Sequence, residues 1–299
     1  MHKAQAWLNM LRVSNTPTII SNVMVGLGLG MVAHTQEWST HAIAPRFVAL
    51  KAFCIILAAL LCAYFGGLVL NDAVDASRDK KHRPERPIPI GVIKLRTAWI
   101  VGVSLLLGAY LLSLLTQDRA ALGMLVLIGC VFLYTFLHRW LLPALLFMGA
   151  CRGMVYVVTA ASFDVVLQGQ PLIAFAIGVA CYTAILTLIA HHEHVKNKMV
   201  KWVALLLLPT AFIPALLYST AFTMIWVVGS LLVFTIWIAF AFWQFASQES
   251  RGKGIHATLA GFCFLDCVYL SIIGEISLAI ISGICFLFTV AAQRKVLGT

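Results

Sequence analysis

Residues 52–79 read AFCIILAALLCAYFGGLVLNDAVDASRD, an apolar run that leads without a break into three aspartates. The run is long enough to cross a bilayer core, which takes about 20 helical residues. A helix that continues past its end turns by about 100° per residue, so Asp72, Asp75 and Asp79 share one face. Close carboxylates repel one another unless a cation lies among them. The stretch therefore predicts a membrane helix whose end carries a cation site.

Apolar runs of similar length recur along the whole chain. Of the 299 residues, 62% are apolar and 11% are charged, and the mean hydropathy is +0.96. This composition excludes water-soluble globular, disordered and collagen-like proteins. The expected fold class is all-α, a polytopic membrane helical bundle of nine to ten transmembrane helices in a single domain, residues 1–299. The runs lie at about 15–33, 47–70, 98–116, 120–137, 141–163, 171–190, 202–219, 221–243, 256–272 and 276–292.

Positive charge is unevenly divided between the two sides of this predicted bundle. With a cytoplasmic N-terminus, most of the 21 Lys and Arg residues fall on that side, above all in the loops 71–97 and 191–201. The positive-inside rule therefore predicts an integral, multi-pass protein of the inner (cytoplasmic) membrane with both termini in the cytoplasm. The net charge of +10 then reflects topology and attraction to anionic membrane lipids, and nucleic-acid binding is not expected.

A basic, proline-rich segment follows the aspartates. Residues 80–91 read KKHRPERPIPIG, in which the prolines end the helix and Gly91 completes a turn. Arg83 and Arg86 offer donors for a polyanion. Since Mg²⁺ takes one or two carboxylates together with phosphate oxygens, the aspartates are the expected metal ligands. The alternative is a set of solvated loop charges, which explains the basic residues but not the alignment of the aspartates.

Two motifs here resemble those of a known family. NDAVDASRD at 71–79 resembles the N-D-x-x-D-x-x-x-D signature of the UbiA superfamily of intramembrane prenyltransferases, and RPERPIPIG at 83–91 is similar to the element that follows it. The resemblance implies a bundle around a central cavity that opens laterally to lipid. It implies that the three aspartates bind Mg²⁺, with Asp72 and Asp75 catalytic and Asn71 a substrate-binding or orienting group. The implied reaction moves a polyprenyl group from its diphosphate to an unidentified cyclic (aromatic or polyol) or lipid acceptor.

The loop at 191–201 departs from the family pattern. Family members usually carry a second aspartate motif there, whereas this chain reads HHEHVKNKMVK. On a helix Glu193, Lys196, Asn197 and Lys201 would share a face, with Glu193 and Lys201 as expected catalytic groups and the other two as substrate ligands. Either the Lys201 ammonium replaces a second metal beside the diphosphate, or the chain binds a prenylated or phosphorylated precursor without turnover. Together with the first loop, this segment is the expected active-site face.

The histidines of the same loop invite a transition-metal interpretation. His191, His192 and His194 carry imidazoles, which are common metal ligands. Adjacent helical positions diverge by about 100°, however, and no H-E-x-x-H spacing is present. Contact with head groups or with the diphosphate is the expected role.

Two charged residues are expected at mid-membrane depth. Arg152 lies about 16 Å into the fifth apolar run, and Asp266 lies at a similar depth in the ninth. The two could form a buried structural pair. Alternatively, Arg152 lines the cavity and contacts substrate.

The first apolar run carries a polar stripe. Asn15, Thr18 and Asn22 have the spacing of one helical face, so Asn15 and Asn22 are candidate substrate ligands. Hydrogen bonding between helices explains the stripe equally well. The same run has a series of glycines that should permit close helix packing: Gly26, Gly28 and Gly30.

A further similarity concerns the junction of the fourth and fifth runs. YTFLHR at 134–139 resembles the family's segment near the diphosphate, with His138 where lysine is common. The resemblance implies that His138 binds substrate and that Arg139 contacts the anion. GACR at 149–152 is similar to UbiA-like proteins of the Ebo type.

Overall fold

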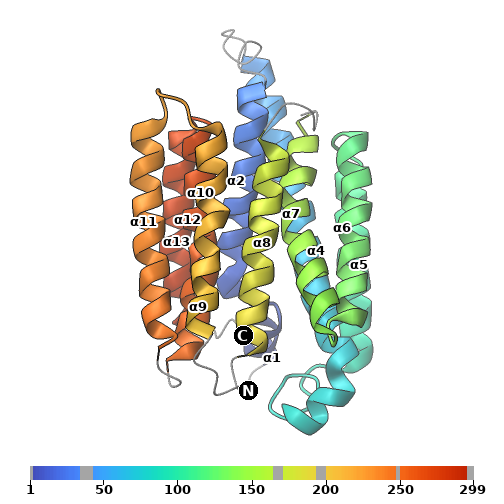
Figure 1. Cartoon of the computed structure of the whole chain (residues 1–299). Coiled ribbons are helices and arrows are strands. Elements are labelled where there is room, and N and C mark those ends of the chain that lie inside the picture. The colour runs from blue at the N-terminus through green and yellow to red at the C-terminus, as the bar shows by residue number, and fades with distance from the viewer. Residues whose placement is uncertain (1–2, 34–42, 164–170, 193–199, 247–249, 295–299) are drawn as a thin grey trace.

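The protein is a bundle of long helices (Figure 1). The computed structural model describes residues 3–33, 43–163, 171–192, 200–246 and 250–294. All regular structure in these ranges is helical, which confirms the predicted all-α class. The helices are α1 (Lys3–Met10), η1 (Val13–Asn15), α2 (Thr16–Ala33), α4 (Ile43–His82), α5 (Leu95–Ser113), α6 (Asp118–Leu137), α7 (Leu141–Ala161), α8 (Leu172–His191), α9 (Val200–Ala204), η2 (Leu205–Leu207), α10 (Leu208–Tyr218), α11 (Met224–Gln244), α12 (Arg251–Ile272) and α13 (Ile276–Gln293).

Ten helical segments in the described ranges are long and apolar enough to cross a membrane, one for each apolar run of the sequence. The upper end of the predicted count is therefore confirmed. The second segment belongs to α4, which is 40 residues long and continues well past the length that spans a bilayer core. The seventh segment is composite, because α9 passes through η2 into α10.

Helices α2 and α12 form the centre of the bundle. In their apolar windows 61% and 78% of the residues are buried, compared with 22% in α5 and in α11. The outer helices expose large apolar side chains such as Leu142, Leu216 and Ile225. Such a surface is stable against lipid tails but not against water.

The glycines of α2 lie where neighbouring helices approach closely, as their series predicts. A methyl group on Gly26 would lie 2.4 Å from Cβ of Thr159 on α7, and one on Gly30 would lie 2.8 Å from Cβ of Phe163. Contacts this short leave no room for a side chain. The central helix therefore packs tightly against α7.

Helix α4 ends at His82, and the chain then turns through the proline-rich segment to α5. Gly91 has a φ of 77°, in the left-handed region that glycine adopts without strain. This turn, α1 and α9 lie at the same end of the bundle (Figure 1). The end of α4 and α9 stand on opposite sides of that end.

Candidate functional site

The three aspartates of α4 are buried at one end of the bundle. Asp72 and Asp75 are each 7% exposed, and Asp79 is 6% exposed. Behind them α1 and the start of α5 cover α4 with apolar side chains, which form one cluster: Ala6, Met10, Val69, Ala73, Ile93 and Ala98. The carboxylates therefore do not point into bulk water, as ordinary loop charges would.

Two arginines compensate the first and third carboxylates. Nη1 of Arg86 lies 2.8 Å from Oδ2 of Asp79 and 3.3 Å from Oδ1 of Asp72. Nη2 of Arg12 lies 3.8 Å from Oδ1 of Asp72. Charge-assisted contacts of this kind stabilise an ionised carboxylate in a partly desolvated place.

Arg12 is a site residue that the sequence did not single out. It is the one non-glycine residue with positive φ, 45°, in the described part of the chain, and it links α1 to η1. A left-handed conformation costs an L-residue about 1 kcal/mol or more. The guanidinium of this residue lies beside Asp72. In the sequence, the only signal of its role is its position just before the first apolar run.

The turn between α6 and α7 supplies the partner of Asp75. Nε2 of His138 lies 3.0 Å from Oδ2 of Asp75, and Nδ1 of His138 lies 3.0 Å from the Thr135 carbonyl oxygen. The hydrogen bond to Asp75 raises the pKa of His138 above its usual value, which favours the imidazolium that donates from both nitrogens. Arg139 is more exposed, and its Nη2 lies 4.0 Å from Oδ1 of Asp75.

The donor atoms of this face fit a cation that arrives with a phosphate. Oδ1 of Asp75 and Oδ1 of Asn71 are buried and have no hydrogen-bond partner among the described residues. Within the same ranges, no three His, Cys, Asp or Glu side chains converge as a closed metal cage. Mg²⁺ does not need one, since it keeps several water or phosphate oxygens beside one or two carboxylates. The orphaned oxygens and the three carboxylates are suitable ligands of that kind.

Other predicted site residues lie apart from this face or outside the described ranges. Arg83 is exposed. Nζ of Lys201 lies 5.3 Å from the ring centroid of Trp202 and 5.8 Å from that of Phe242, on the α9 side of the bundle. The rings of His191 and His192 contact each other edge to face. The predictions for four residues fall outside the described ranges: Glu193, His194, Lys196 and Asn197.

The polar residues inside the bundle form a connected network. Asp266 of α12 is fully buried and accepts hydrogen bonds from Ser21 and Asn22 of α2 and from Tyr156 of α7. The Asn22 amide therefore serves a contact between helices. Asn15 is also buried, at the start of the same polar stripe.

Arg152 is not in an ion pair with Asp266. Nη2 of Arg152 donates to Oγ1 of Thr18 at 2.6 Å, and its guanidinium lies 4.2 Å above the Phe262 ring. The interpretation as a direct structural pair is therefore wrong. The Asp266 carboxylate already accepts hydrogen bonds from the neutral donors Ser21, Asn22 and Tyr156, so the Arg152 guanidinium does not contact it directly.

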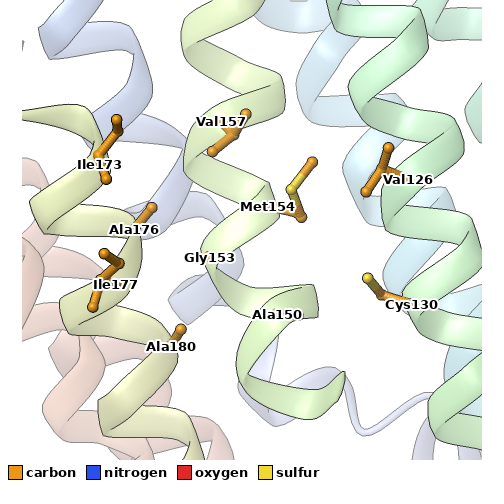
Figure 2. A pocket seen from close by; sticks show the side chains of 10 residues that line it. All are labelled: Val126, Cys130, Ala150, Gly153, Met154, Val157, Ile173, Ala176, Ile177 and Ala180. Atoms are coloured by element: carbon orange, nitrogen blue, oxygen red, sulfur yellow. The ribbon is translucent and has the colours of Figure 1, made fainter. Parts of the chain in front are cut away.

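A separate apolar groove of about 310 Å³ lies between α6, α7 and α8 (Figure 2). Its α7 wall is formed by Ala150, Gly153, Met154 and Val157, and only carbon and sulfur side-chain atoms line it. Arg152 leaves α7 on a different face, toward α2 and α12. The groove has room for a hydrocarbon chain, but its lining side chains offer no hydrogen-bonding or charged group.

Fold and site together describe a membrane helical bundle with a carboxylate face, flanked by arginines, at one end. A model of the UbiA prenyltransferase family matches residues 23–265. The chain therefore belongs to the UbiA prenyltransferase family, which confirms the resemblance seen in the sequence.

Curated relatives match over part of the chain. A digeranylgeranylglyceryl phosphate synthase from Metallosphaera sedula is 31% identical over 122 residues, which cover 37% of this chain and 38% of the relative. The protein of the same name from Pyrococcus horikoshii is 38% identical over 105 residues, which cover 34% and 36%. The chain thus matches less than half the length of either relative.

Solved structures share the fold over nearly the whole chain. A digeranylgeranylglyceryl phosphate synthase structure covers 93% of this chain and 100% of its own, with a TM-score of 0.61 and 17% identity. A UbiA homologue from Archaeoglobus fulgidus bound to GPP and Mg²⁺ covers 97% and 99%, with a TM-score of 0.54 and 15% identity. At these identities the likeness shows the fold alone.

Proposed function

We propose that this protein is a Mg²⁺-dependent prenyltransferase that moves a polyprenyl group from its diphosphate to a cyclic or lipid acceptor. The observation that carries the proposal is the buried face of Asp72, Asp75 and Asp79, in which Oδ1 of Asp75 has no hydrogen-bond partner among the described residues. Buried acids without full compensation are suited to a cation and its polyanion. The Mg²⁺ and prenyl diphosphate held by the Archaeoglobus fulgidus homologue are of this chemistry.

The arrangement suits a reaction whose difficult step is cleavage of the bond between C1 of the donor and the diphosphate oxygen. The electron pair of that bond leaves with the diphosphate, the acceptor nucleophile bonds to C1, and the acceptor loses its proton. Bound Mg²⁺ would neutralise the leaving group. Asp72, Asp75 and Asp79 would hold the ion, with Asn71 oriented toward it. Arg86, Arg12 and His138 would then be released toward the phosphate oxygens.

The interior of the bundle would protect the cationic carbon. Water that reached an allylic cation would quench it to an alcohol, so an apolar environment favours transfer to the acceptor. We infer that residues 1–299 form one domain and that the aspartate face lies on the cytoplasmic side of the inner membrane, where the positive-inside rule puts it.

Purified protein in nanodiscs tests the proposal. Geranylgeranyl diphosphate should bind only when Mg²⁺ is present. When a suitable acceptor is added, inorganic diphosphate should be released. Asp72→Asn should weaken Mg²⁺-dependent donor binding by about 100-fold or more, since it removes one carboxylate and its charge. Asp118→Asn, which changes an exposed acid at the start of α6, is the matched control and should have no effect. Equal donor binding by Asp72→Asn and Asp118→Asn would contradict the proposed site.

The same assay separates catalysis from binding alone. The unusual second loop, in which Lys201 stands where the family has an acid, is the feature that favours a non-catalytic carrier. Metal-dependent donor binding without diphosphate release, over a panel of aromatic, polyol and glycerol phosphate acceptors, would support that alternative. Lys201→Ala should weaken donor binding if the ammonium substitutes for a metal.

A further inference from the structure

Arg152 places a positive charge about halfway along a membrane-spanning helix without an acidic partner. In the described part of the chain, no carboxylate oxygen lies within 4.0 Å of its guanidinium, which contacts Thr18 and the face of Phe262. A buried charge is costly unless it is paired and hydrogen-bonded. Arginine has five N–H donors, and the contact with Thr18 uses one of them.

The nearest candidate counter-ion is already occupied. Asp266 is 0% exposed and accepts hydrogen bonds from Ser21, Asn22 and Tyr156. These donors belong to α2 and α7, and they supply the hydrogen bonds that the buried carboxylate needs. The negative charge of Asp266 therefore stabilises the Arg152 guanidinium through space, but its carboxylate oxygens accept no hydrogen bond from Arg152.

The side chain of Arg152 points into the interior of the bundle. Arg152 is partly exposed, although it lies against α2 through Thr18 and against α12 through Phe262. These contacts point inward from α7, away from the apolar groove (Figure 2).

Helix α7 sets the distance from the aspartate face. His138, just before α7, contacts Asp75 and so belongs to that face. Arg152 lies 11 residues after Leu141, the first residue of α7, or about 16 Å along the helix axis. Arg152 therefore marks a second polar position, deeper in the membrane than the aspartate face.

We propose that Arg152, steadied by Thr18 and Phe262, binds an anionic group of the prenyl acceptor, in a subsite separate from the aspartate face that takes the donor diphosphate. This inference rests on the proposed function, because it names the acceptor class for that reaction. A phosphate or carboxylate suits a guanidinium fork with free N–H groups better than a neutral hydroxyl does. The separation along α7 would leave the donor C1 between the two anions, within reach of the acceptor nucleophile.

The test compares a monoalkylglycerol phosphate with the matching monoalkylglycerol in nanodiscs of zwitterionic lipid. Wild-type protein should bind the phosphate probe at least about tenfold more tightly. Arg152→Gln should abolish this preference, and Arg152→Lys should retain part of it. Both variants should bind a non-hydrolysable prenyl diphosphate analogue with Mg²⁺ within about twofold of wild type, which also shows that they are folded.

The outcomes separate this inference from the function on which it rests. Asp72→Asn should show the opposite pattern, with loss of donor-analogue binding and an intact preference for the phosphate probe. Equal binding of the two probes by wild type, or an unchanged preference in Arg152→Gln, would overturn the acceptor subsite and leave the donor site standing. Equally strong competition by phosphatidylglycerol or by inorganic phosphate would assign the anion to bulk lipid or to solvent and would overturn it as well.

Discussion

Nη1 of Arg86 lies 2.8 Å from Oδ2 of Asp79, because the chain turns back after α4 and returns an arginine to the helix that it has just left. The same atom lies 3.3 Å from Oδ1 of Asp72. One guanidinium thus bridges two of the three carboxylates that we propose as metal ligands. A bound cation and this arginine would neutralise the same charges, so each should substitute in part for the other.

Arg86→Gln should therefore destabilise the metal-free protein and make it more responsive to Mg²⁺. The loss in EDTA should be about 2 kcal/mol, because two buried carboxylates lose a charged donor. Thermal unfolding in detergent, with EDTA or with Mg²⁺, measures both effects. The control is Arg83→Gln, which alters an exposed arginine of the same turn and should change stability by less than about 0.5 kcal/mol. If the difference in stability between Arg86→Gln and Arg83→Gln were the same in EDTA and in Mg²⁺, the idea that Arg86 and the cation neutralise the same carboxylates would be contradicted.

The contact of His138 with Asp75 predicts a pH-dependent stability. The hydrogen bond to Asp75 raises the pKa of His138 in the folded protein, so the stabilisation is fully present below the unfolded pKa of about 6.5 and is lost as pH rises through the raised value. His138→Gln should thus lower the melting temperature most at about pH 5.5 and least at about pH 9. The exposed His82→Gln should give no such trend. Parallel pH curves for wild type and His138→Gln would refute the linkage.

Asp266 should stabilise the bundle as a hydrogen-bond acceptor more than as a counter-ion. Asp266→Ala would leave Ser21, Asn22 and Tyr156 without their acceptor in a water-free interior, at a cost of about 3 kcal/mol or more. Asp266→Asn keeps the side-chain volume and one acceptor oxygen, which can still accept from Tyr156 and Asn22, so it should cost less than Asp266→Ala. Comparison of the two variants by thermal unfolding is decisive. Equal destabilisation of the two variants would show that a single acceptor oxygen does not suffice and that the ionised carboxylate, with both its oxygens and its charge, is required.

The sequence predicted the spans and the aspartate helix because both depend on local properties. An apolar run of about 20 residues fixes a membrane helix wherever it occurs, and the angle of 100° per residue aligns Asp72, Asp75 and Asp79 whatever their neighbours are. The break after His82 followed from the prolines, whose rings do not fit inside a helix. None of these inferences required knowledge of how helices pack.

The pairing between helices was less accessible, for a geometric reason. Distance along a span predicts a similar depth for Arg152 and Asp266, but it does not determine which side chains meet. Asp266 contacts Ser21, Asn22 and Tyr156, whereas Arg152 contacts Thr18 and Phe262, which lie one turn before Asn22 on α2 and one turn before Asp266 on α12. Short α1 was missed as well, since its apolar stretch is far below membrane length. The site roles predicted for Lys201 and for the loop before it stay predictions.

Close packing at Gly26 should make this position sensitive to a single methyl group. Gly26→Ala would bring Cβ to within 2.4 Å of Cβ of Thr159, so α2 and α7 must separate, at a cost of about 1–3 kcal/mol. The matched control is Gly108→Ala on α5, where nothing lies within 4 Å of the added atom. That change should be neutral or stabilising by up to about 1 kcal/mol, because alanine favours the helix over glycine.

The same substitution should also affect ligand binding, since α2 carries Thr18 and α7 carries Arg152. The shift caused by Gly26→Ala should weaken the hydrogen bond between these two residues and reduce binding of the phosphate probe. Gly108→Ala should leave probe binding intact. Equal stability of the two variants would show that the α2 and α7 contact can relax without loss.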